Sequence, residues 1–106
     1  MFEEHSILED NGELPSKGKL QWNCRRGMKE LEVVLGPYLE HCYDSVSLET
    51  QKRFVRMLGF DDASLYAWFM GYEKPEELEL EQIIQEVQDA VANLHKHQAD
   101  SSNRVI

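Results

Sequence analysis

The chain has 106 residues, 42% of them hydrophobic and 29% charged, which is enough apolar material for one folded domain and too much for a disordered chain. A formal net charge of −9 disfavours binding to nucleic acid or to anionic membranes, because phosphates attract a basic surface. The first residues are acidic and no apolar run reaches membrane-spanning length, so we expect a cytoplasmic protein that does not insert into a membrane.

The chain begins with an acidic stretch that contains turn-forming residues and little to bury. We expect residues 1–16 to be a mobile arm. Ser16 is a suitable N-cap for a first helix over residues 17–26, with Leu20 and Cys24 on one side. Trp22 lies off that apolar line.

Two longer helices are expected next. The second helix has an apolar stripe with spacings of three and four residues: Met28, Leu31, Leu35, Tyr38 and Cys42. Pro37 lies inside this pattern and predicts a kink, since it removes a backbone donor. Ser47 is expected to cap a third helix that ends at Gly59. Its predicted stripe is Leu48, Gln51, Phe54, Val55 and Leu58.

A short fourth helix is expected from Asp61 or Asp62 to Gly71. Its inward side chains are Leu65, Trp68 and Phe69. The last helix has Pro75 in its first turn and an amphipathic stripe of Leu80, Ile83, Ile84, Val87, Val91 and Leu94. Residues 17–98 are thus predicted to form one all-α bundle of four or five helices, followed by a frayed tail over residues 99–106.

Charge is distributed unevenly along the chain. Between Lys17 and Glu30 there are five basic residues and one acid, a local charge of +4: Lys17, Lys19, Arg25, Arg26 and Lys29 against Glu30. Residues 60–89 instead hold nine acids and one lysine, which is typical of a solvated face that would also steer a basic partner surface. A basic segment in an acidic chain indicates a functional surface.

Gly27 interrupts this basic segment, although a glycine inside a helix costs about 1 kcal/mol relative to alanine. It either lets the chain turn a corner between two helices or lets a partner approach where a Cβ would collide. Arg26 and Glu30 are four residues apart, so they either pair along one helical turn or both contact a partner. The spacing alone leaves these alternatives open.

The ordered set of residues around Gly27 resembles the small bacterial succinate dehydrogenase assembly factors of the SdhE family, also described as CptB-type antitoxins. The matching residues are Trp22-x-Cys24-Arg25-Arg26-Gly27-Met28-x-Glu30-Leu31, Leu35-Gly36-Pro37-Tyr38, Tyr43-Asp44-Ser45-x-Ser47 and Leu65-x-x-Trp68-x-Met70. The resemblance covers about residues 18–95. It implies a fold of five helices.

The resemblance also implies a function. It points to a non-catalytic assembly factor, or chaperone, which binds the flavoprotein subunit of succinate dehydrogenase, with fumarate reductase as a second candidate. Such a factor promotes covalent attachment of FAD that the partner holds, so no cofactor is expected to be bound by this chain. Carried over residue by residue, Arg26, Gly27 and Glu30 form the core of the partner-binding site. Arg25, Trp22 and Met28 flank it.

Two other functions were weighed. The alternative is an antitoxin-type regulatory protein that binds a membrane or cytoskeletal partner. The third candidate function is an enzyme that uses Cys24 as a nucleophile. No base lies near Cys24 in the sequence, and cysteines are often buried. A packing role for Cys24 is therefore preferred, and no catalytic residue is assigned. The four histidines lack the spacing of metal-binding helices, so no metal site is predicted.

Overall fold

The computed structural model describes the backbone of residues 14–105 and the side chains of residues 14–94. Within this range the chain forms five α-helices, one short 3-10 helix and no β-strand. The helices are α1 (Lys17–Asn23), α2 (Lys29–His41), α3 (Leu48–Leu58), α4 (Asp62–Met70) and α5 (Leu78–Val105), and the 3-10 helix η1 covers Tyr43–Ser45. The predicted all-α fold is confirmed.

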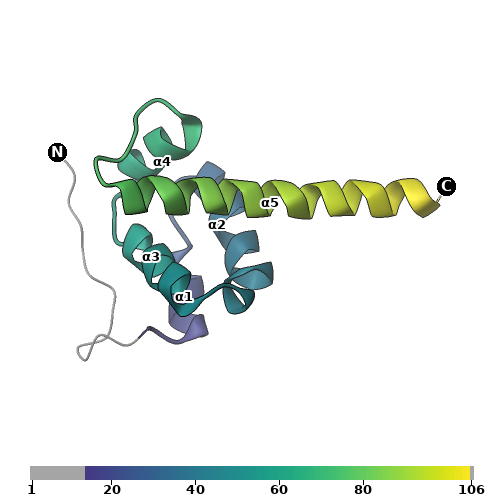
Figure 1. The fold of residues 1–106 in the computed structure, drawn as a ribbon, viewed down its shortest axis with the longest axis horizontal. Helices are drawn as coiled ribbons and strands as arrows, with labels where there is room; N and C mark the ends of the chain where they lie inside the picture. Colours follow the sequence, from purple (N-terminus) through teal and green to yellow (C-terminus); the bar gives the residue numbers. More distant parts are fainter. Residues whose placement is uncertain (1–13, 106) are drawn as a thin grey trace.

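Helix α5 is the longest and packs against α2, α3 and α4 (Figure 1). Its C-terminal part, yellow in Figure 1, extends beyond the other helices. The buried face of α5 is the predicted stripe of Leu80, Ile83, Ile84, Val87 and Val91. Helices α2 and α3 also contact each other in the core, where the ring centroids of Tyr38 and Phe54 are 4.8 Å apart. Removing these apolar side chains from water, at about 25 cal/mol per Å², is the main force that joins the helices.

The predicted caps explain where three of the helices begin. Ser16 Oγ accepts a hydrogen bond from the Lys19 amide at 3.3 Å, and Ser47 Oγ accepts one from the Thr50 amide at 3.2 Å. Asp61, rather than Asp62, caps α4 and accepts from the Ser64 amide at 3.3 Å. Each cap satisfies an amide that has no partner inside its helix.

Glycines close two helices as predicted. Gly59 caps α3, and Gly71 ends α4 with φ +80°, a left-handed conformation that glycine adopts without steric penalty.

The boundaries of two helices differ from the sequence-based prediction. Helix α1 ends at Asn23 and not at Arg26, because Arg26 turns back to bond a carbonyl at the end of the helix. Helix α5 begins at Leu78, so Pro75 lies before it and not in its first turn. Helix α5 continues to Val105, with no glycine or proline after Pro75 to stop it, and the fraying expected over residues 99–106 stays a prediction.

Two further predictions concern single segments. Leu48, expected in the buried stripe of α3, is 57% exposed because it occupies the first turn of the helix. The acidic arm was predicted over residues 1–16, and its residues 1–13 lie outside the described residues. Within the described part, Leu14 packs against the core and Pro15 is buried. Pro37 lies inside α2, and the kink expected there stays a prediction.

Candidate functional site

The loop from Cys24 to Met28 joins α1 to α2 and contains the centre of the basic segment. At its start the Cys24 amide bonds the Leu20 carbonyl at 2.9 Å, and the Arg25 amide bonds the Trp22 carbonyl at 3.1 Å. At its end Met28 is extended (φ −117°, ψ 120°) and its carbonyl accepts from the Leu31 amide, which starts α2. The loop is therefore defined by a helix end on each side.

Arg26 points into the protein. Its side chain is only 13% exposed, and Nε pairs with Asp62 Oδ1 at 2.6 Å, at the beginning of α4. Nη1 donates to the Leu58 carbonyl at 2.8 Å and the Asn23 carbonyl at 3.1 Å, and Nη2 donates to the Phe60 carbonyl. Leu58 and Asn23 end α3 and α1, where carbonyls lack partners inside the helix and attract positive charge. One guanidinium thus joins the ends of α1 and α3 to the start of α4.

This arrangement argues against one of the two uses of Arg26 that the spacing had left open, the pair with Glu30 along one helical turn. Arg26 lies before α2 begins, and its fork is occupied by Asp62 and three carbonyls rather than by Glu30. Its place in the partner-binding site stays a prediction. What the geometry adds is that Arg26 holds the loop from within the fold.

Asp62 makes a second contact with the same loop. Its Oδ2 accepts a hydrogen bond from the Gly27 amide at 2.9 Å, while Oδ1 takes the Arg26 bond. The sequence-based prediction missed this residue as part of the site. A signal was present: two adjacent aspartates lie at the start of α4, and one of them, Asp61, suffices as its cap.

Gly27 lies at the surface, and its backbone is outside the left-handed region that favours glycine. A Cβ added there would meet only Asp62 Oδ2, at 3.3 Å. The corner therefore does not need glycine for its backbone angles. The new Cβ would press on the carboxylate oxygen that accepts the Gly27 amide, so the missing side chain leaves room for this internal contact. The approach of a partner at the exposed Gly27 stays a prediction.

The other predicted site residues lie close to Gly27 in the sequence and differ in exposure. Arg25 is exposed just before Gly27, and Glu30 is exposed in the first turn of α2, where the helix dipole favours an acid. Trp22 is 69% exposed at the end of α1. Met28 differs from them, because it is half-buried and packs against the core. We call the exposed set of Trp22, Arg25, Gly27 and Glu30 the loop face.

Cys24 lies under this loop and not on its surface. It is buried, and its Sγ is 3.9 Å from the Leu35 carbonyl. Burial raises the pKa of the thiol from 9.0 to about 11, and the nearby Arg26 charge lowers it only in part. The thiolate needed for nucleophilic attack is disfavoured at neutral pH, so the structure supports the preferred packing role.

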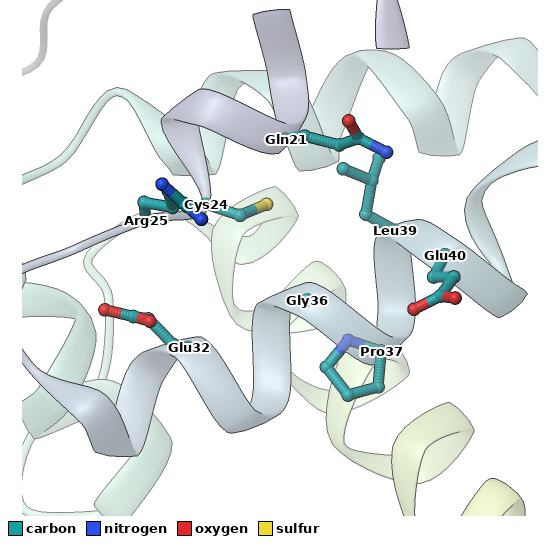
Figure 2. A pocket seen from close by; sticks show the side chains of 8 residues that line it. All are labelled: Gln21, Cys24, Arg25, Glu32, Gly36, Pro37, Leu39 and Glu40. Carbon is teal, nitrogen blue, oxygen red and sulfur yellow. The ribbon is translucent and has the colours of Figure 1, made fainter. Parts of the chain in front are cut away.

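A shallow groove lies beside the loop, between α1 and α2 (Figure 2). Gln21, Cys24 and Arg25 line one side, and five residues of α2 line the other: Glu32, Gly36, Pro37, Leu39 and Glu40. Figure 2 shows Arg25 and Glu32 at one end of the groove and Glu40 at the other. Its walls carry charges of both signs, and Arg25 is the residue that it shares with the loop face.

Of the four histidines, only His41 has a side chain that the structure describes. His41 is exposed at the end of α2, and the side chains of His5, His95 and His97 lie outside the described range. Among the side chains that the structure describes, no three histidine, cysteine or acidic groups come close enough to hold a metal ion. No helix in the described part of the chain is both long and apolar enough to cross a bilayer.

The fold and site together define a small all-α protein that displays an open loop between two helices, an arrangement suited to contacts with another protein. Residues 18–91 match the family described as flavinator of succinate dehydrogenase, and the chain belongs to that family.

Individual relatives agree. An FAD assembly factor SdhE from Pectobacterium atrosepticum is 38% identical over 76 residues, covering 72% of this chain and 86% of the relative. One from Idiomarina loihiensis is 45% identical over 71 residues, covering 67% and 79%. The solution structure of a UPF0350 protein superposes with a TM-score of 0.60 at 39% identity, covering 79% of this chain and 87% of that one. The suggested resemblance to the SdhE family is thereby confirmed.

Proposed function

We propose that this protein is a non-catalytic assembly factor that binds the flavoprotein subunit of succinate dehydrogenase and promotes covalent attachment of FAD. The family match over residues 18–91 carries this proposal, together with relatives that are named FAD assembly factors. The flavin belongs to the partner, and this chain acts on the partner's conformation. The flavoprotein of fumarate reductase is the second partner to test.

The loop face supports a role in binding. Gly27 leaves room for a partner backbone, the exposed Trp22 ring supplies apolar area, and Arg25 and Glu30 offer one charge of each sign. Exposed aromatic and arginine side chains are the residue types that contribute most at protein interfaces. Because Arg26 and Asp62 fix the loop from behind, little conformational entropy is lost when a partner binds it.

The non-catalytic role is supported by the chemistry of Cys24. A nucleophilic thiol should be accessible and have a lowered pKa, whereas this one is buried and its pKa is raised to about 11. The chain is therefore proposed to help the partner's own chemistry.

Deleting the gene and measuring in-gel flavin fluorescence of the large succinate dehydrogenase subunit tests the proposal. We expect covalent flavin to fall severalfold in the deletion strain and to return with the wild-type gene. A Cys24→Ser gene is the matched control and should restore flavin as well as wild type does. Unchanged covalent flavin in the deletion strain would contradict the proposal.

A further inference from the structure

Asp62 is not among the site residues predicted from the sequence, yet its two oxygens are both used on the loop that carries Gly27. Oδ1 receives Arg26 Nε at 2.6 Å and Oδ2 receives the Gly27 amide at 2.9 Å. The residue begins α4, so its backbone is fixed by a helix that packs against α2 and α5. The two hydrogen bonds of Asp62 therefore join the start of α4 to the exposed loop between α1 and α2.

We propose that Asp62 is a positioning residue for partner binding: it fixes the Arg26–Gly27 peptide so that Gly27 and Glu30 are presented together. This inference rests on the proposed function, because the loop is taken to be the surface that meets the partner. Asp62 itself is about one third exposed, and it acts through the loop. A loop already held in its binding shape loses less entropy on association.

Both oxygens of Asp62 are needed because both partners are donors. Arg26 presents Nε–H and Gly27 presents its backbone N–H, so each requires an acceptor. Asparagine has the same shape but only one acceptor oxygen, and its NH₂ group would face a donor on one side or the other. Asp62→Asn therefore removes one of the two links without changing side-chain volume.

The neighbouring residue provides a matched control. Asp61 caps α4 through Ser64, accepting from its amide at 3.3 Å and its hydroxyl at 2.6 Å, whereas the hydrogen bonds from the loop go to Asp62. Asparagine is as good an N-cap as aspartate, so Asp61→Asn should preserve the helix start. Asp61→Asn and Asp62→Asn change net charge equally, at adjacent positions, and differ in the link to Gly27.

The experiment measures two quantities on the full chain at a temperature well below its melting point. The first is hydrogen exchange of the Gly27 amide by NMR, which needs no partner. The second is affinity for the purified FAD-free flavoprotein subunit. For Asp62→Asn we expect Gly27 exchange to accelerate and affinity to fall, each by about tenfold, the effect of losing one hydrogen bond. Asp61→Asn should stay within about twofold of wild type in both.

Several results would overturn the inference. Asparagine can keep either bond, so Asp62→Ala, which keeps neither, is measured beside it. Unchanged Gly27 exchange in both folded variants would refute the link, and accelerated exchange with wild-type affinity would refute its role in binding. If wild type itself does not bind the subunit, the proposed function fails and this inference fails with it, while the exchange result still reports on the loop. Should Asp62→Asn not fold, Asp62→Ser replaces it, since serine suits a helix start but is too short to reach both donors.

Discussion

The Arg26 guanidinium and the Asp62 carboxylate form an ion pair of 2.6 Å that ties the loop between α1 and α2 to the start of α4. The same guanidinium bonds carbonyls at the ends of α1 and α3. An arginine that the resemblance placed in a partner-binding motif is thus also a junction between helices. Replacing Arg26 should therefore lower the stability of the fold as well as the affinity for a partner.

Replacing Arg26 tests this junction. We expect Arg26→Ala to lower the free energy of unfolding by about 2–4 kcal/mol, because it leaves a carboxylate and several carbonyls without their donor. Arg26→Lys should recover only part of the loss, since an ammonium cannot reproduce the planar fork. Urea denaturation measures both. A variant with wild-type stability in either case would show that the junction contributes little.

Local chemistry made much of this fold predictable. Ser16 and Ser47 cap helices and Gly59 and Gly71 end them, and the stripe of α5 faces the core, because each of these features depends on residues a few positions apart. The Gly27 loop was likewise visible as a break in helix-forming sequence.

The contacts behind that loop could not be predicted in the same way. Arg26 and Asp62 are 36 residues apart, and their meeting depends on how α4 packs against α2. Helical spacing offered Glu30 as the only nearby partner for Arg26. The exposure of Leu48 could not be predicted for the same reason. An apolar stripe predicts which face of a helix is buried, but it does not predict how far the neighbouring helices extend along that face.

The raised pKa of Cys24 predicts a specific dependence of stability on pH. Below about pH 9 the thiol is protonated in both folded and unfolded chains, so it contributes no pH dependence. Between pH 9.0 and about 11 the unfolded thiol ionises while the folded one stays protonated, and stability falls as pH rises. The loss from this group should reach about 2–3 kcal/mol.

Cys24→Ser isolates that contribution, because serine does not ionise and the tyrosines titrate in both proteins. At pH 7 the variant should be less stable by about 1 kcal/mol, as expected for a buried hydroxyl in place of a thiol. That deficit should shrink and then reverse as denaturation is measured from pH 8 to pH 10.5. A constant difference over this range would mean that the thiol ionises as easily in the folded chain.

Two glycines should respond differently to alanine. Gly71→Ala is expected to cost about 1 kcal/mol, because its φ of +80° is unfavourable for any residue with a Cβ. Gly27→Ala should cost less, since its backbone is not left-handed and the new Cβ requires only a shift of a few tenths of an ångström in Asp62 Oδ2, which lies 3.3 Å away. Urea melts of both variants provide the comparison, and equal losses would contradict it.

Affinity for the flavoprotein subunit should depend moderately on salt. In the basic segment Lys17 pairs with Asp44 at 2.5 Å and Arg26 pairs with Asp62, while Arg25 and Lys29 are exposed on either side of Gly27. We expect affinity to fall by about threefold to tenfold from 0.05 to 0.5 M salt, with the Trp22 contribution persisting at high salt. Titration at several ionic strengths checks this, and a salt-independent affinity would remove electrostatic attraction from the account.

The most direct test of the open loop is covalent flavin formation in a purified FAD-free flavoprotein subunit supplied with FAD and Gly27→Val protein. Gly18→Val is the matched control, because a Cβ at Gly18 of α1 meets nothing within 4 Å. Both variants should keep helical circular dichroism and a cooperative melt. We predict that Gly27→Val leaves covalent flavin near the level without any factor, while Gly18→Val matches wild type. A folded Gly27→Val protein that promotes flavinylation as well as wild type would contradict the claim that the partner approaches at Gly27.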